Sequence, residues 1–201
     1  MAGVAGQGRR FSAAEALEAA TMVFWKHGYE GASLKMLTTA MGINPPSMYK
    51  AFGSKDELFF SAIEHYNATY GRFFTEALEE EATAAGLLPR ILHAAAEHYT
   101  QPEFPGGCLT ISAAVTVTPE NKRIAERLSA LRNCRVEAIK TALDQTPDWK
   151  DSLTPAKTAA AFMGATMQGM SQQARDGATA QSLHATADLA LTALGIPSGS
   201  R

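Results

Sequence analysis

The side chains best suited to recognise another molecule lie within one short stretch of the sequence, Ser33 to Glu57. Asn44, Ser47 and Lys50 bring an amide, a hydroxyl and an amine to this stretch. Such groups are the donors and acceptors that hydrogen-bond to base edges in the major groove of DNA. The two prolines between them have no N–H to donate, but they can pack against thymine methyls or sugars.

Residues that can bind DNA phosphates flank these candidate base-reading residues in the sequence. Tyr49 can donate its hydroxyl, and Ser33 and Lys35 stand at a helix start, where free backbone N–H groups would help. Lys55 has the same position in the next helix. The segment 1–10 ends in two arginines, and it is either a disordered tail or a basic arm that reaches phosphate or the minor groove. The predicted DNA contacts are Arg10, Ser33, Lys35, Asn44, Pro45, Pro46, Ser47, Tyr49, Lys50 and Lys55.

No set of residues is typical of a catalytic or metal site. The five histidines are scattered, and neither HExxH nor GxSxG occurs. Cys108 and Cys134 lie too far apart for a metal knuckle or a redox pair, and we expect two buried thiols in a reducing compartment. Cys108 follows two glycines near a helix start, where the dipole lowers a thiol pKa, so a thiol sensor stays open. We therefore expect no catalytic residue, no metal and no cofactor.

Capping and turn residues divide the stretch into two short helices and the start of a third. Ser33 is a good N-cap for the first helix, and Gly42 supplies the positive φ of the turn that ends it. Asn44 caps the second helix, which opens with two prolines, tolerated where N–H groups have no partner. Gly53 ends that helix, and Ser54–Glu57 is a capping box for the next. This order is the outline of a helix-turn-helix.

The same stretch resembles the DNA-binding domain of TetR-family transcriptional regulators. The resemblance rests on Gly42-Ile43-Asn44 and on the run from Met48 to Leu58, in which Tyr-x-x-Phe-x-Ser-Lys is the most specific part. It extends back through Ala19-Ala20, Phe24, Gly28-Tyr29 and Ser33 and covers the first third of the chain. The departure lies at the two prolines, where family members commonly have a small or basic residue.

The resemblance implies a homodimer that binds a palindromic operator in double-stranded DNA, most often as a repressor. Two heads would address half-sites about 34–36 Å apart, or a multiple of that distance. A small-molecule effector in the body would release the operator by changing the spacing of the heads. Two other classes stay open: a small helical enzyme, and a helical interaction protein that keeps such a head without DNA function.

Composition sets further bounds. The chain has 201 residues, 46% of them hydrophobic, which allows a sizeable core and excludes a largely disordered chain. No apolar run approaches the ~20 residues that span a bilayer. The N-terminus lacks the apolar core of a signal peptide, so we expect a cytoplasmic protein without a membrane partner. Residues 1–55 hold six Lys or Arg against three acids, and 56–201 hold twelve against seventeen, which suits a basic head on an acidic body.

The remaining pattern predicts an all-α fold of about nine helices, with a three-helix DNA-binding head and a helical body for ligand binding and dimerisation. In the first helix, Ser12 to Gly28, we expect Trp25 to pack in the core. The β-branched run after Gly107 would be a strand without a partner, so we expect a buried helix closed by Thr118-Pro119. The other predicted helices are Ser54 to about Glu80, 87–101, 119–145, 155–176 and 179–195.

These elements predict four parts of the chain. They are a flexible basic arm at 1–10, a DNA-binding domain at 11–57 (the helix-turn-helix proper at about 33–52), a regulatory domain at 58–197 and a tail at 198–201.

Aromatic and apolar residues of the body are candidates for the effector pocket, since such pockets are lined mainly by apolar groups. They are Tyr66, Tyr70, Phe73, Phe104, Cys108, Phe162, Met163 and Met167. The last two helices are rich in small residues, and the resemblance favours a four-helix subunit interface over an intramolecular core. The predicted interface residues are Ala159, Phe162, Thr166, Gly169, Met170, Leu183, Ala187, Leu191 and Leu194.

Overall fold

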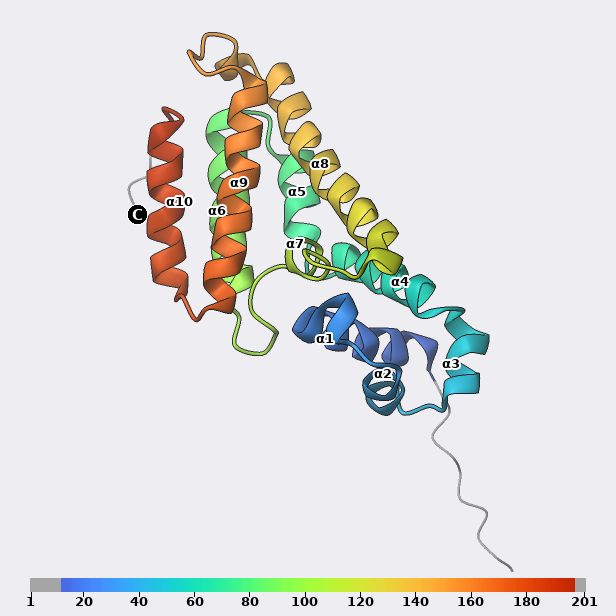
Figure 1. Cartoon of the computed structure of the whole chain (residues 1–201). Helices are drawn as coiled ribbons and strands as arrows, with labels where there is room; N and C mark the ends of the chain where they lie inside the picture. The colour runs from blue at the N-terminus through green and yellow to red at the C-terminus, as the bar shows by residue number, and fades with distance from the viewer. Residues whose placement is uncertain (1–11, 198–201) are drawn as a thin grey trace, which may run out of the picture.

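The computed structural model describes residues 12–197, and within this range every regular element is a helix (Figure 1). Ten α-helices and two short 3-10 helices follow one another, against about nine helices expected. The all-α prediction is confirmed. The predicted arm at 1–10, with Arg10, and the predicted tail at 198–201 lie outside the described residues.

Three helices form the head, in the lower right of Figure 1: α1 (Ala13–Gly31), α2 (Leu34–Met41) and α3 (Pro45–Phe52). They pack around α4 (Lys55–Ala68), which leads into the body. Phe24, Leu37, Met48 and Phe59 are fully buried between these helices. The Phe24 and Phe59 rings pack edge to face, with their centroids 5.0 Å apart. This small core holds the helix-turn-helix rigidly from beneath.

The local chemistry predicted for the helix-turn-helix is present. The Ser33 hydroxyl and the Asn44 side-chain oxygen each accept a hydrogen bond from a backbone amide three residues on, at 3.1 and 2.9 Å. Gly42 adopts a left-handed φ of 67° at the end of α2. The capping box is complete, because the Ser54 amide donates to the Glu57 carboxylate (2.7 Å) and the Glu57 amide to the Ser54 hydroxyl (3.2 Å).

The single helix expected from Ser54 to about Glu80 is wrong. The chain turns at residues 69–71, which separates α4 from α5 (Arg72–Glu80). The Gly71 amide donates back to the Tyr66 carbonyl at 2.8 Å, and a Cβ on Gly71 would lie 3.2 Å from the Tyr66 ring. The apolar stripe continues across the turn, which is why helical periodicity did not reveal it.

The segment after Gly107 is neither a strand nor the expected buried helix. Only α7 (Leu109–Ser112) is α-helical, and Pro119 opens a separate 3-10 turn. Gly107 has a φ of +75°, and a Cβ there would lie 2.5 Å from the Ser171 carbonyl of α9. The chain thus enters α7 pressed against α9. It leaves α7 through Ala113, whose carbonyl accepts from the Tyr29 amide of α1 (2.7 Å).

The body contains α5 and four longer helices: α6 (Ala84–Tyr99), α8 (Lys122–Gln145), α9 (Ala156–Arg175) and α10 (Ala180–Ala193). In Figure 1, α6, α9 and α10 lie side by side, while α8 runs obliquely along α9 and α5. The helix predicted at 87–101 begins three residues earlier and includes Gly86, because Thr83 caps it and Asp148 accepts from two of its first amides. Among the described residues, no helix is long and apolar enough to cross a membrane.

Candidate nucleic-acid interface and effector site

The outer face of α3 carries the predicted base-reading side chains. Asn44, Ser47 and Lys50 are exposed, and Tyr49 keeps 47% of its surface exposed although it is a large aromatic residue. On the opposite face, Met48 is fully buried and fixes the helix to the head. Asn44 uses its side-chain oxygen as the N-cap, so only its amide N–H groups stay free to donate.

The start of α3 is blocked as a phosphate site. Pro45 and Pro46 are its first two residues, and both are exposed. Neither has an N–H, and the amide of the next residue, Ser47, already donates to Asn44. Free backbone N–H groups, which bind phosphate at other helix starts, are therefore missing from this end of α3.

The start of α2 has the opposite character. Ser33 and Lys35 are exposed, and the amides of Leu34 and Lys35 precede the first intrahelical hydrogen bond. The Ser33 oxygen accepts from the Met36 amide, which leaves its hydroxyl hydrogen free to donate. Donors and a cation thus meet at one exposed helix start, which suits a phosphate.

Lys55 is more enclosed than its predicted role as a phosphate contact assumes. Its Nζ lies 4.3 Å from the centroid of the Tyr29 ring, over the ring face. Burial lowers the pKa of Lys55, while the nearby carboxylates of Glu30 and Asp56 oppose that shift. The amine is therefore already engaged by neighbours within the head.

Two polar contacts connect the head to the body through Asp56. The Tyr29 hydroxyl donates to one carboxylate oxygen of Asp56, and Arg123 of α8 pairs with the other. Burial and the Asp56 carboxylate raise the pKa of Tyr29 above its ordinary range, which keeps the hydroxyl protonated. The first turn of α4 is thereby held between α1 and α8.

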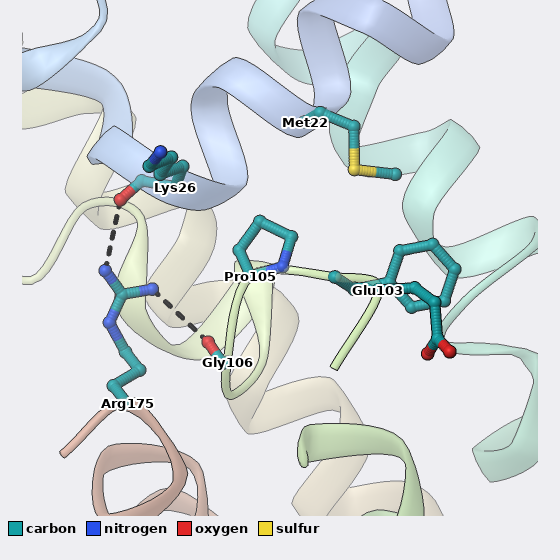
Figure 2. A pocket seen from close by; sticks show the side chains of 7 residues that line it. Met22, Lys26, Glu103, Pro105, Gly106 and Arg175 are labelled. Carbon is teal, nitrogen blue, oxygen red and sulfur yellow. Dashed lines mark hydrogen bonds between the residues drawn. The ribbon is translucent and has the colours of Figure 1, made fainter. Parts of the chain in front are cut away.

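A second connection is made by Arg175, the last residue of α9, whose surroundings appear in Figure 2. Its guanidinium donates to the carbonyls of Trp25 (3.2 Å), Lys26 (3.3 Å) and Gly106 (3.4 Å). The Trp25 indole in turn donates to the Gly107 carbonyl at 3.2 Å. One side chain of the body therefore caps the end of a head helix.

Four of the predicted pocket aromatics, Tyr66, Tyr70, Phe73 and Phe104, lie together with Trp25 and His98. We use the name aromatic cluster for Trp25, Tyr66, Tyr70, Phe73, His98 and Phe104. Trp25 packs edge to face on Tyr66, with centroids 4.8 Å apart, and stacks on Phe104 at 5.8 Å. The ring centroids of Phe73 and His98 lie 5.4 Å apart. The cluster joins a residue of the head to residues of α4, α5, α6 and the loop before α7.

Two of these aromatic residues have polar atoms with distinct environments. The Tyr70 hydroxyl donates to Glu18, and burial together with this contact raises the pKa of Tyr70 to about 12. Glu18 also contacts His65 Nε2 at 2.5 Å. By contrast, His98 Nε2 is buried without a hydrogen-bond partner, and burial lowers the pKa of His98. The cluster thus offers one unpaired ring nitrogen to a ligand.

Two open cavities border the aromatic cluster. The first, of about 540 Å³, lies between α1, the loop before α7 and the end of α9 (Figure 2). Its lining is Met22, Lys26, Glu103, Phe104, Pro105, Gly106 and Arg175. The second, of about 530 Å³, lies along α5 and α6 and includes Tyr70, Phe73 and His98. Both have the size of small-molecule sites.

The other pocket candidates are distributed differently. Cys108 is 1% exposed at the start of α7, and Met163 is fully buried in α9. Met167 borders a much smaller cavity of about 30 Å³ together with Arg132 and Arg135. Phe162 lines neither of the two larger cavities, because α9 turns this side chain outward and leaves it 41% exposed.

The predicted interface residues divide into two sets. Phe162, Thr166 and Gly169 lie on the outer side of α9, and the space beyond the Gly169 Cα is open. The others are wrong as surface contacts, because α6, α9 and α10 bury them inside one chain; they are Ala159, Met170, Leu183, Ala187, Leu191 and Leu194. Leu189 of α10, which was not predicted, is 72% exposed.

Sequence reasoning also missed Arg132 and Arg135. Both are half-buried on α8, and Arg135 donates to Thr110 (3.1 Å) and Asn67 (2.7 Å). The available signal was two cations three residues apart within the apolar stripe of a helix. His98 is one of the five scattered histidines, and nothing in its spacing indicated the aromatic surroundings.

Comparison with known proteins agrees with this geometry. Residues 16–62 match the model of the family described as bacterial regulatory proteins, tetR family. The chain is 31% identical over 189 residues to the HTH-type transcriptional repressor BdcR of Escherichia coli, covering 93% of this chain and 91% of that protein. The repressor ComR of the same organism is 29% identical over 182 residues, covering 89% and 86%.

A solved structure gives the same answer for the fold. The TetR family regulator CifR, a cysteine mutant described in complex with 26-bp operator DNA, superposes with a TM-score of 0.87. The two proteins are 37% identical, and the match covers 93% of this chain and 99% of that one. Both the helix-turn-helix head and the helical body are included in this match. The chain therefore belongs to the TetR family of bacterial regulatory proteins.

Proposed function

We propose that this protein binds a palindromic operator as a homodimer and represses transcription until a small molecule binds its body. The observation that carries the proposal is the rigid head, in which α3 exposes polar side chains over a fully buried Met48. It is supported by relatives that are described as transcriptional repressors. The site of action would be the cytoplasm, and the activity would be binding rather than catalysis.

On the DNA, we assign different tasks to α3 and α2. Ser47, Lys50 and the free amide of Asn44 would read bases, and Pro45 and Pro46 would pack against methyl groups or sugars. Tyr49 and the start of α2, with Ser33 and Lys35, would hold phosphates. Lys55 would act on phosphate only after leaving the Tyr29 ring, so we expect it to contribute less than Lys35.

The effector would bind at the aromatic cluster from one of the two bordering cavities. The cluster is mostly aromatic surface, and its polar atoms are the unpaired His98 nitrogen, the Trp25 N–H and the hydroxyls of Tyr66 and Tyr70, which suits a small aromatic or aliphatic molecule with a polar group. Trp25 belongs to α1, so a ligand that separates it from Tyr66 or Phe104 would change the contact between the head and the body. Such coupling requires only that the ligand bind the displaced state more tightly.

The two heads would be joined through the outer faces of α9 and α10. Phe162 and Leu189 are large apolar side chains exposed there, next to the open surface at Gly169. Two such helices from each chain would form a four-helix bundle. The buried residues beneath this face would fix its shape without touching the partner.

The test is a polarisation assay on DNA that flanks the protein's own gene. We expect binding that prefers particular sequences and weakens with salt. Lys35→Ala should weaken binding to all sequences and lower the salt slope by about one, and Lys55→Ala should have the smaller effect. Ser47→Ala and Lys50→Ala should change which bases are preferred. Lys157→Ala, an exposed lysine of α9, is the matched control. Unchanged preferences in both α3 variants would exclude them as base readers.

A further inference from the structure

The thiol of Cys108 is held among hydrogen-bond donors. Its Sγ lies 3.0 Å from Thr110 Oγ1, and the Arg135 guanidinium donates to that same hydroxyl at 3.1 Å. Because the guanidinium can only donate, it occupies a lone pair of the hydroxyl and leaves the hydroxyl proton free for the sulfur. This order of donors favours a negatively charged sulfur.

The charges around the thiol also favour a negatively charged sulfur. Arg132 and Arg135 are half-buried, and no carboxylate among residues 12–197 forms an ion pair with either of them. Burial alone would raise the pKa of the Cys108 thiol, but the Arg135 charge and the Thr110 hydrogen bond bring it below its ordinary value. The charge of a Cys108 thiolate acts on both guanidiniums, so this thiol can supply the missing negative charge.

Two further hydroxyls lie beside this thiol and have no oxygen or nitrogen partner. The hydroxyl oxygens of Tyr66 and Tyr99 are buried, the side chains are 0% and 1% exposed, and the Cys108 sulfur is the acceptor beside both of them. Burial, followed by the negative charge of Cys108, raises the pKa of both, so both are donors at neutral pH. Buried donors need an acceptor, and a thiol sulfur is a weak one. An oxygen atom added at Cys108 would give both hydroxyls a stronger acceptor.

Room beside Arg135 is limited to a very small molecule. The cavity bordered by Arg132, Arg135, Ile111 and Met167 has a volume of about 30 Å³. That volume corresponds to about one water molecule. A reagent the size of a maleimide does not fit without opening the fold.

We propose that Cys108 is an oxidation site for small, uncharged hydroperoxides, and that its sulfenic acid accepts hydrogen bonds from Tyr66 and Tyr99. The thiolate sulfur attacks one peroxide oxygen, so that the S–O bond forms as the O–O bond breaks. The electron pair of the O–O bond leaves on hydroxide or alkoxide, which takes a proton and departs as water or alcohol. Sulfur is oxidised by two electrons and the peroxide is reduced by two. The proposal does not depend on DNA binding.

Cys134 provides an internal control, because it lies exposed on α8 whereas Cys108 is buried. The folded protein is treated with hydrogen peroxide, the excess peroxide is removed with catalase, and the protein is then unfolded in the presence of dimedone, so that the reagent reaches any sulfenic acid already formed. The adduct at each cysteine is measured by peptide mass spectrometry. A parallel sample is treated with N-ethylmaleimide while folded. We expect the two reagents to choose opposite residues: dimedone adducts at Cys108 and maleimide adducts at Cys134. Faster peroxide oxidation of Cys134 would overturn the proposal.

Variants separate the thiol environment from simple burial. Arg135→Gln should slow dimedone labelling of Cys108 severalfold, because less of the thiol is ionised without the guanidinium, while Arg135→Lys keeps much of the rate. The matched control is Arg127→Gln. Arg127 is on α8, as Arg135 is, but its guanidinium lies over the ring of Phe60 in α4. Thr110→Val preserves side-chain volume and gives a second test if Arg135→Gln does not fold. The assignment is refuted if both Arg135→Gln and Thr110→Val label Cys108 at the wild-type rate. If Arg135→Gln does not fold, the wild-type rate in Thr110→Val alone refutes it.

Discussion

The guanidinium of Arg175 donates to the main-chain carbonyl of Trp25 at 3.2 Å, across 150 positions of the sequence. That carbonyl is free because the helix changes course at Gly28, where φ is 70° and ψ is 178°. The Tyr29 amide, which would have been its partner in a continuous helix, donates to Ala113 instead. The end of α1 is therefore completed by the body, and the position of the head depends on α9.

Removal of this contact should loosen the head from the body. Arg175→Gln shortens the side chain and removes its charge, so the Trp25 and Lys26 carbonyls lose their donor. We expect a loss of about 2 kcal/mol in the free energy of unfolding, as for a hydrogen bond to a charged group. Urea denaturation measures this loss. Arg72→Gln, which breaks an exposed pair with Glu76, should cost less than about 0.5 kcal/mol; an equal loss in both variants would contradict the role of Arg175.

The close approach of α1 to α7 makes a second prediction. A Cβ on Gly28 would lie 2.9 Å from the Ala113 carbonyl oxygen, in a backbone conformation that only glycine adopts readily. Gly28→Ala should cost about 2 kcal/mol or more in the free energy of unfolding. Gly195→Ala introduces a methyl at φ +74° with open space around it, and it should cost only about 1 kcal/mol. Equal melting temperatures for the two variants would show that the α1–α7 contact is not tight.

Burial of His98 makes stability depend on pH. Since burial lowers its pKa in the folded protein, the unfolded chain binds more protons just below the ordinary histidine pKa of about 6.5. Its contribution to stability is complete above that pH and is lost as the pH falls below it. His98→Phe keeps an aromatic ring and removes the titration, so the decrease in unfolding free energy between pH 7.5 and 5.5 should become smaller. An unchanged decrease would mean that other groups cause it.

The proposed dimer face can be tested with a charge. Phe162→Glu or Leu189→Glu places a carboxylate on the outer side of α9 or α10, where the partner would bury it. Each variant should therefore be monomeric at micromolar concentration by light scattering, where the wild type is dimeric. Leu153→Glu is the control, because Leu153 is fully exposed on a loop outside this face and its change should leave the dimer intact. Dimers in all three variants would contradict the assignment.

Local chemistry made the head predictable, because caps and turns depend on residues three or four positions apart. Ser33, Gly42, Asn44 and Ser54 all have the predicted conformations. The break at Gly71 was not predictable in this way, since the apolar stripe runs through it and the turn is set by contact with Tyr66. Periodicity identifies which side of a helix is apolar, but it does not show what covers that side.

The same limit explains the errors in the body. Ala159 and Leu183 have the small or apolar side chains of an interface, yet neighbouring helices of the same chain bury them. Phe162 belongs to the same apolar pattern and points outward. The aromatic cluster was partly predictable from composition, but the central place of Trp25 follows from the packing of α1 against the body, which is a long-range contact.

The most direct test of the central claim is the affinity of the intact dimer for its operator, compared with that of variants on the outer face of α3. The Tyr49→Phe, Lys50→Ala double variant keeps the buried Met48 and should fold as the wild type does. If α3 is the DNA-reading element, the wild type should bind DNA flanking its own gene with sequence preference and salt dependence. The double variant should bind at least about tenfold more weakly, which corresponds to about 1.4 kcal/mol. Wild-type binding without sequence preference, or equal affinity in the folded double variant, would contradict the account.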